Sequence, residues 1–382
     1  MIAGYRCPRD GRTSPAADLN WHCPDCGSPW DLDHSAGRVD QDQLASRPAS
    51  LWRYAEALPL NDPSISLGEG FTPMVALDER VSAKLDFLMP TLSFKDRGAA
   101  MLIEAANRLR PERVIADSSG NAGTAVAAYA ARAGLSCTIY VPATTSAKKI
   151  EQVRAHGAEV MIIDGDRETT ARAAQWGADQ PGTFYASHVY NPYFLHGTKT
   201  YGYELWESYG GRLPEVIALP VGNGTLVLGV ALAIEELVDH GLLDRRPRLV
   251  AVQTEVVAPL ARAHREGLIE LPAGYATSAE TIAEGIAIAD PARAPQILAA
   301  IERSGGDIVT VADAEVAAAQ QDLAARGLYV EATAGACWAA VRHAERAETD
   351  EDQLGWQLLA DQEVVVPLCG AGLKSGLASV QT

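Results

Sequence analysis

The sequence predicts an α/β fold in which helices flank parallel β-sheets, and two observations lead to this prediction. First, residues 113–164 alternate twice between short apolar runs and helical patterns, which is typical of parallel strands joined by crossover helices. Second, glycine-rich turns recur where an apolar run ends and a helical pattern begins. The chain has 382 residues, of which 47% are hydrophobic, so it can form two lobes and a small appendage.

The N-terminal segment has the cysteine spacing of a zinc ribbon in which aspartate replaces one ligand. The four residues with this spacing are Cys7, Asp10, Cys23 and Cys26. A carboxylate can complete a tetrahedral zinc site, and His22 or His34 is an alternative fourth ligand. A bound zinc ion would be structural, because four protein ligands leave no open position for catalysis. The other interpretation is a ribbon that has lost its metal and persists as a small packed loop.

A lysine with an unusual predicted environment follows in the stretch Thr-Leu-Ser-Phe-Lys-Asp-Arg-Gly. Apolar residues from Met101 onward recur at helical spacing, and Ser93 is the predicted N-cap, so Lys95 falls in the first helical turn. The helix macrodipole and burial beneath Phe94 would both lower the pKa of this lysine. An amine of that kind can form an imine, whereas the alternative is an ordinary solvated lysine.

Three glycine-rich turns extend the pattern around Lys95. Residues 116–123 follow an apolar run and precede an alanine-rich helix, residues 219–225 end a second strand-like run, and residues 364–372 lie near the C-terminus. In this order, the stretches resemble the pyridoxal-phosphate enzymes of fold type II, and within them threonine synthase, over residues 65–375. The resemblance implies a two-lobed fold like that of the tryptophan synthase β subunit.

The resemblance implies a set of cofactor-binding residues. They are Lys95, Phe94, Asn121, Gly222, Asn223, Gly224, Thr225 and Cys369. Lys95 would carry the cofactor as a Schiff base, Asn121 would contact the ring hydroxyl, and residues 222–225 would hold the phosphate through backbone N–H groups. A thiol at Cys369 makes the pyridine ring a weaker electron sink than a carboxylate would, which favours elimination or replacement over transamination. Without the resemblance, Cys369 reads equally well as a buried small hydrophobe. Relatives place a glutamate near the ring at Glu331, which is otherwise a solvated turn residue.

The resemblance also implies a set of substrate-binding residues. They are Thr91, Ser118, Ser119, Ala122, Phe194 and Lys199. The chain departs from typical threonine synthases in two stretches, residues 89–92 and residues 194–198, and in the second it has His196 for a glutamate and Thr198 for a glutamine. It has Met-Pro-Thr-Leu at residues 89–92 where they carry Asn-Pro-Thr-Gly, and Phe194 where they carry an arginine for the substrate phosphate. Either the substrate lacks a phosphoryl group, or other residues such as Lys199 hold it. Lys199 is otherwise a solvated lysine, and His196 is a pocket-wall or packed histidine rather than a general base.

These assignments predict three domains. Residues 1–37 form the zinc-ribbon-like segment, residues 38–95 and 195–382 form the large cofactor-binding lobe, and residues 96–194 form a small mobile substrate-binding lobe. The resemblance implies that the small lobe rotates over the substrate and excludes water.

Composition excludes several classes of partner. The formal net charge of −17 and the pI of about 4.9 argue against nucleic acid and anionic membranes. No stretch approaches the ~20 apolar residues of a membrane span, and the N-terminus lacks an apolar signal core, so we expect a cytoplasmic protein. Six cysteines in a chain of this length do not indicate a disulfide scaffold. The resemblance implies a homodimer.

Three functions remain after this reading. The first is a lyase or synthase that acts as threonine synthase does, converting O-phosphohomoserine to threonine. The second is a threonine or serine dehydratase, or a β-replacement enzyme, on an unphosphorylated substrate, and Phe194 favours it. The third is a protein that binds pyridoxal phosphate without turnover, which Lys95 and Asn121 make the least favoured of the three.

Overall fold

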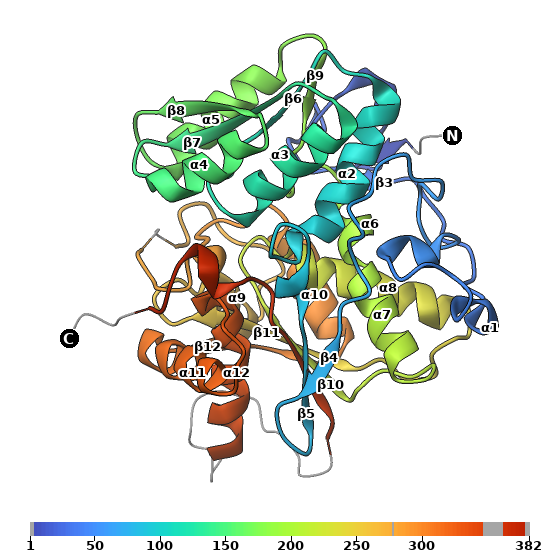
Figure 1. Cartoon of the computed structure of the whole chain (residues 1–382), viewed down its shortest axis with the longest axis vertical. Helices are drawn as coiled ribbons and strands as arrows, with labels where there is room; N and C mark the ends of the chain where they lie inside the picture. The colour runs from blue at the N-terminus through green and yellow to red at the C-terminus, as the bar shows by residue number, and fades with distance from the viewer. Residues whose placement is uncertain (1–3, 277–278, 347–361, 379–382) are drawn as a thin grey trace. The chain divides into compact units, whose positions relative to one another are not determined.

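A computed structural model describes residues 4–276, 279–346 and 362–378, and the chain divides into two compact units (Figure 1). Unit 1 comprises Met1–Phe71 and Met89–Thr200, and unit 2 comprises Thr72–Leu88 and Tyr201–Thr382. This division differs from the predicted lobes, because residues 38–71, 89–95 and 195–200 of the predicted large lobe belong to unit 1. Apolar residues of the N-terminal segment, Leu51 and Leu60 among them, share one buried core with the helix that follows Lys95.

Unit 1 begins with a small antiparallel sheet of order β2-β1-β3. Its strands are β1 (Tyr5–Arg6), β2 (Thr13–Ser14) and β3 (Asp31–Leu32). Tyr5 pairs with both Ser14 and Leu32, so β1 is the central strand. The N-terminal segment is therefore a small three-stranded ribbon in which each strand has two residues.

The main sheet of unit 1 is parallel and has the order β8-β7-β6-β9. Its strands are β6 (Arg113–Ala116), β7 (Cys137–Pro142), β8 (Glu159–Ile163) and β9 (Thr183–Tyr185). The unit's main helices are α2 (Lys95–Leu109), α3 (Asn121–Ala133), α4 (Ala147–Ala155), α5 (Arg167–Ala178) and α6 (Tyr193–Thr198). Because parallel crossovers are right-handed, α3 and α4 cover one face and α5 covers the other (Figure 1).

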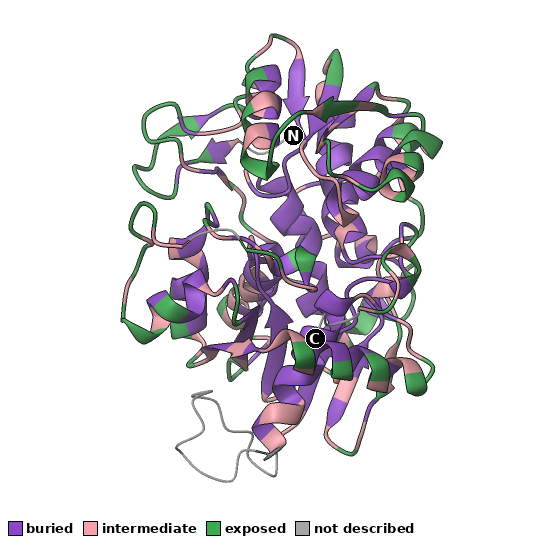
Figure 2. Ribbon diagram, turned by 90° about the vertical axis from the view of Figure 1, so that its left-hand side faces the viewer, coloured by how far each residue is buried: buried purple, intermediate pink, exposed green. Residues whose placement is uncertain are grey.

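The sheet of unit 2 has the order β12-β11-β10-β13-β5-β4, and its neighbours are parallel except for β4 and β5. Its strands are β4 (Met74–Ala76), β5 (Val81–Lys84), β10 (Val216–Pro220), β11 (Arg248–Thr254), β12 (Asp307–Val311) and β13 (Val364–Pro367). Its helices include α7 (Thr200–Ser208), α8 (Thr225–Asp239), α9 (Pro259–Arg265), α10 (Ala294–Arg303), α11 (Asp313–Ala325) and α12 (Ala332–Arg346). Strands β10 and β13 are buried along their whole length. Figure 2 shows that exposed residues lie mainly on outer loops and on the outward sides of helices.

Each parallel sheet contains a point where the direction of the crossovers reverses. In unit 1 the chain moves from β6 to β7 and β8, and then returns to β9 on the other side of β6. In unit 2 it moves from β10 to β11 and β12, and then returns to β13 on the other side of β10. Ligand sites of open α/β sheets form at the carboxyl ends of the strands at such switch points. Among the described helices, none combines the length and hydropathy needed to cross a membrane.

Candidate active site

Lys95 is the first residue of α2, as predicted, and its amine lies among aromatic rings. Its Nζ is 4.4 Å from the centroid of the Phe94 ring and 5.6 Å from that of Phe194. The prediction that Ser93 caps the helix is wrong, because Phe94 occupies the N-cap. The Ser93 hydroxyl is instead buried without a hydrogen-bond partner among the described residues. An orphaned hydroxyl two positions before Lys95 fits a site that a bound group completes.

The turn before Lys95 is held by a buried carboxylate. The side chain of Asp96 accepts hydrogen bonds from the backbone N–H of Thr91 at 2.7 Å and from its hydroxyl at 2.6 Å. Leu92, where typical threonine synthases have glycine, adopts a left-handed backbone with φ 63°. Such a backbone costs a non-glycine residue roughly 1–2 kcal/mol. Because the Thr91 hydroxyl donates its hydrogen bond to Asp96, the geometry favours a role for Thr91 in stabilising this turn.

The loop after β6 leads into α3 with open backbone donors. Helix α3 begins at Asn121 after Gly120, and no side chain caps it, so its first N–H groups can bind an anion. A Cβ at Gly123 would collide with the carbonyl oxygen of Ser118, which folds back over the first turn. The Ser118 hydroxyl accepts a hydrogen bond from the backbone N–H of Gly120 at 3.3 Å. Ser118, Ser119, Asn121 and Ala122 thus lie at the carboxyl edge of β6, at the switch point.

The substrate-loop neighbour Asp117 is connected to the N-terminal ribbon. The Tyr185 hydroxyl donates a hydrogen bond of 2.7 Å to Asp117, whose pKa is raised by burial. Trp21 packs edge-on against Tyr185, with ring centroids 5.4 Å apart, and against Tyr190 at 4.9 Å. The ribbon therefore supports the two loops that flank the switch point of unit 1. No sequence motif indicated this contact, because Trp21 and Tyr185 are distant in the chain.

The glycine-rich turn after β10 forms a second uncapped helix start, in unit 2. Helix α8 begins at Thr225, and Gly224 at its N-cap has φ 75° and no side-chain hydrogen bond. Gly222 leaves no room for a side chain, because its Cβ would lie 3.0 Å from the Cα of Ile286 and 2.9 Å from Cγ1 of Ile288. The loop therefore has the residue types that a close-fitting anion site requires, and its members are Gly222, Asn223, Gly224 and Thr225.

Replacing Gly224 by alanine is expected to weaken binding of pyridoxal phosphate by about tenfold or more. The left-handed backbone strains alanine by roughly 1–2 kcal/mol, and the new Cβ collides with the Ile297 side chain. Cofactor affinity can be measured by fluorescence titration of the apoenzyme. Gly241→Ala is the matched control, because Gly241 has φ 62° but open space around it. Equal losses in both variants would contradict the assignment of the loop.

Cys369 follows β13, beside β10 at the switch point of unit 2. Its buried thiol donates to Oε1 of Glu331 at 3.9 Å, and the backbone N–H of Glu331 donates to the Gly370 carbonyl oxygen at 2.9 Å. Glu331 therefore contacts Cys369. Glu331 is partly buried, and its carboxylate lies beside the predicted ring-nitrogen residue.

Two further predicted substrate residues, Phe194 and Lys199, lie in different surroundings within unit 1. Phe194 is buried beside Lys95, and a Cβ at Gly98 would collide with its ring, so α2 and α6 pack closely there. Lys199 is also buried, but its Nζ donates to the carbonyl oxygen of Ala57 at 2.6 Å. His196 lies close enough for the charge of Lys199 to lower its pKa, after the larger effect of burial. The geometry favours packing roles for Lys199 and His196, and leaves Phe194 near the lysine.

The four predicted metal ligands come together in the ribbon. The ligand atoms of Cys7, Asp10, Cys23 and Cys26 lie within 4.8 Å of one another. Two matching turns carry these ligands, Cys-Pro-Arg-Asp-Gly at residues 7–11 and Cys-Pro-Asp-Cys-Gly at residues 23–27. In each turn the backbone N–H of the glycine donates a hydrogen bond to the carbonyl oxygen of the first cysteine, at 3.1 Å for Gly11 and 2.8 Å for Gly27. Asp10 thus occupies in the first turn the place of Cys26 in the second. Tetrahedral ligands about 2.3 Å from a zinc ion lie about 3.8 Å apart, and Cys7 Sγ lies 3.5 Å from Cys26 Sγ.

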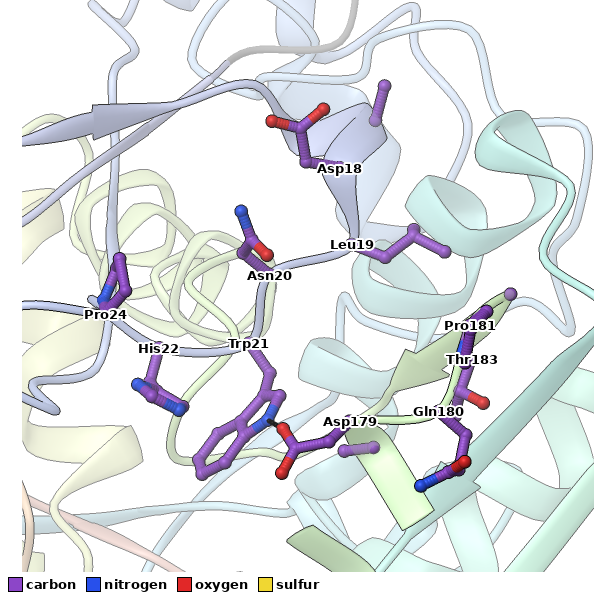
Figure 3. Close-up of a pocket in the computed structure, with 13 residues that line it drawn as sticks. Asp18, Leu19, Asn20, Trp21, His22, Pro24, Asp179, Gln180, Pro181 and Thr183 are labelled. Carbon is purple, nitrogen blue, oxygen red and sulfur yellow. Dashed lines mark hydrogen bonds between the residues drawn. The ribbon is translucent and has the colours of Figure 1, made fainter. Parts of the chain in front are cut away.

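A pocket of about 430 Å³ lies elsewhere in unit 1, between residues 17–24 of the ribbon and residues 178–183 (Figure 3). Trp21 points toward Asp179 in this pocket, and its indole N–H donates a hydrogen bond of 2.8 Å to that carboxylate. Of the predicted site residues, it is lined only by His22, the alternative fourth metal ligand, and by none of the predicted catalytic or cofactor-binding residues. The pocket therefore does not represent the site around Lys95.

Comparisons with known proteins agree with this arrangement. The family described as pyridoxal-phosphate dependent enzyme matches residues 65–378. A threonine synthase of Methanosarcina acetivorans is 30% identical over 382 residues, covering 95% of this chain and 94% of that protein. A threonine synthase of Methanocaldococcus jannaschii is 29% identical, covering 98% of this chain and 94% of that protein. A solved structure of a pyridoxal 5'-phosphate-dependent aspartate racemase has 25% identity and a TM-score of 0.65, covering 78% of this chain and 90% of that one.

Proposed function

We propose that this chain, which belongs to the pyridoxal-phosphate-dependent enzyme family and is threonine synthase-like, catalyses elimination or replacement at the β or γ carbon of an amino acid. Conversion of O-phosphohomoserine to threonine is the first candidate reaction. The observation that carries the proposal is Lys95 at the start of α2, in the same unit as the uncapped start of α3. An amine and an anion site are the two groups that an amino-acid substrate of this chemistry requires.

The residues have separate roles in this proposal. Pyridoxal phosphate supplies an aldehyde that joins an amine and a ring that accepts the electron pair released at the α carbon. Lys95 would hold the cofactor, and its amine, when free, would remove the α proton of the substrate. The open N–H groups of α3 bind the substrate carboxylate, and those of α8 bind the cofactor phosphate. Cys369, which contacts Glu331, would be the partner of the ring nitrogen.

A second candidate is a dehydratase or β-replacement enzyme that acts on an unphosphorylated amino acid. It is favoured by Phe194, which stands where typical threonine synthases carry a phosphate-binding arginine. The Phe194 side chain is buried, and its ring centroid lies 5.6 Å from Nζ of Lys95. Lys199 does not restore that charge, since its amine donates to the Ala57 carbonyl oxygen.

Four amino acids distinguish these candidates: O-phosphohomoserine, O-phosphoserine, threonine and serine. Each is incubated with the holoenzyme, and threonine, inorganic phosphate and keto acid are measured. Threonine formed from O-phosphohomoserine, with inhibition by added phosphate, would support the synthase. Keto acid from serine or threonine, insensitive to phosphate, would support the second candidate. An enzyme that turns over none of the four would contradict both.

We also propose that Cys7, Asp10, Cys23 and Cys26 bind one structural zinc ion, supported by the two matching turns. Asp10→Ala is expected to weaken zinc binding by more than the roughly 10- to 100-fold typical of losing an outer-shell partner. It should also lower the melting temperature, because metal-binding energy contributes to folding. Zinc content by mass spectrometry and thermal unfolding test this. Asp10→Cys should keep the metal, and Asp25→Ala, which changes an exposed carboxylate of the second turn, is the control. If Asp10→Ala retains zinc, the assignment of Asp10 as a ligand is wrong.

We propose a homodimer in the cytoplasm, acting on a small amino-acid substrate. Light scattering coupled to size-exclusion chromatography measures the oligomeric state directly, and a monomer would contradict the first part.

A further inference from the structure

His188 is a buried histidine to which the proposed mechanism gives no role. It follows the end of β9 by three residues, while Asn121 begins α3 after the neighbouring strand β6. The backbone N–H of Ala186 donates to the Ile115 carbonyl oxygen at 2.7 Å, so the two strands remain paired up to their carboxyl ends. His188 therefore lies at the switch point of unit 1, where ligands of open α/β sheets bind.

The neighbours of His188 are the residues around the reactive lysine. Its ring centroid is 5.8 Å from that of Phe194, and the same Phe194 ring lies 5.6 Å from Nζ of Lys95. The charge of Lys95 reaches His188, because it helps to lower the pKa of the imidazole. This histidine is thus part of the wall around Lys95, on the side formed by Phe194.

The imidazole is buried and has no hydrogen-bond partner. Its exposed fraction is 8%, and within residues 4–276, 279–346 and 362–378 neither ring nitrogen makes a hydrogen bond. Its ring nitrogens keep a small accessible area, since they are not among the fully buried polar atoms that lack a partner, so a bound ligand can reach them and supply the missing hydrogen bond.

Its protonation state limits what it can bind. Burial, and then the charges of Lys95 and Arg167, lower the pKa of His188 well below 6.5. The ring is therefore neutral at neutral pH, with one N–H donor and one acceptor nitrogen. A neutral donor suits an oxygen atom that accepts a hydrogen bond. The adjacent Phe194 is apolar and can offer no such bond.

We propose that His188 is a specificity-determining residue that donates a hydrogen bond to the oxygen substituent on the β or γ carbon of the amino-acid substrate. This inference rests on the proposed function, because it places an amino acid at Lys95. The oxygen can belong to a phosphoryl ester or to a hydroxyl group, since both accept a hydrogen bond. In either case His188 recognises the group that leaves, while Lys95 acts at the α carbon.

The test measures binding to the holoenzyme, through the change in cofactor absorbance recorded by stopped flow before turnover. Three ligands are compared: O-phosphohomoserine, homoserine, and 2-aminobutyrate, which lacks the oxygen. His188→Phe should raise the dissociation constant of O-phosphohomoserine about 10- to 100-fold if the substrate is a phosphoryl ester. It should raise that of homoserine about 3- to 10-fold if the hydroxyl is recognised, and change that of 2-aminobutyrate less than about twofold.

His188→Asn keeps a side-chain donor and should restore most of the preference for the oxygen-bearing ligands. This second variant keeps the test decisive if the phenylalanine variant fails to fold. Equal weakening of all three ligands, or unchanged binding of both oxygen-bearing ones, would overturn the inference. Because the readout is binding, a wild-type enzyme that binds these ligands but turns over none of the four amino acids tested above would refute the proposed function, while the ratio of affinities still decides the role of His188.

Discussion

Lys95→Ala is expected to lower turnover by about a thousandfold or more while leaving the fold intact. The variant removes the only group that the mechanism uses both to hold the cofactor and to move the α proton, and general acid–base catalysis alone contributes roughly 10²- to 10⁴-fold. Lys95 is partly exposed at the start of α2, so its truncation to alanine, a good helix former, should not destabilise the helix. Turnover and circular dichroism measure the two effects.

The covalent role of Lys95 has a separate readout. Borohydride reduction of the holoenzyme followed by peptide mass spectrometry should find the cofactor on the peptide that contains Lys95, and no cofactor on that peptide in Lys95→Ala. Lys148→Ala is the matched control, because Lys148 is an exposed lysine of α4. Full activity in Lys95→Ala, or cofactor attached to another lysine in the wild type, would reject the assignment.

Local sequence patterns were sufficient for the elements that carry the candidate site. The alternation within residues 113–164 corresponds to β6, α3, β7, α4 and β8 in that order. The glycine-rich turns were visible because each has a local physical reason. Gly123 and Gly222 lack room for a side chain, and Gly224 has a left-handed backbone. The chain order of these turns also led to the correct family.

Features that depend on distant contacts were not predictable in this way. Ser93 has the right composition for an N-cap, but the Thr91–Asp96 hydrogen bonds set the turn and move the cap to Phe94. The boundary of unit 1 depends on which apolar residues of the N-terminal segment reach the core of α2, and no periodicity encodes that. His188 belongs to no local motif, so its place beside Phe194 emerges only from the packing of α6 near β9.

The largest loss of stability is expected from breaking a buried ion pair in unit 2. Lys84 Nζ lies 2.8 Å from Oε2 of Glu204, and both side chains are 1% exposed. The same carboxylate accepts a hydrogen bond from the backbone N–H of Thr72 at 3.2 Å, and Lys84 donates to the Thr72 carbonyl oxygen at 2.9 Å. The pair therefore fastens the segment that contains β4 and β5 to α7.

Glu204→Ala should lower the free energy of unfolding by about 3–5 kcal/mol, because it leaves the Lys84 ammonium buried without its carboxylate. Urea-induced unfolding followed by tryptophan fluorescence measures this. Glu266→Ala breaks the exposed pair with Arg262, whose side chains are 55% and 46% exposed, and should change stability by less than about 1 kcal/mol. The double variant Lys84→Met with Glu204→Leu should regain most of the loss, since apolar residues of similar volume carry no desolvation penalty. If Glu204→Ala proves as stable as Glu266→Ala, water must reach Lys84, and the pair cannot be what fastens this segment to α7.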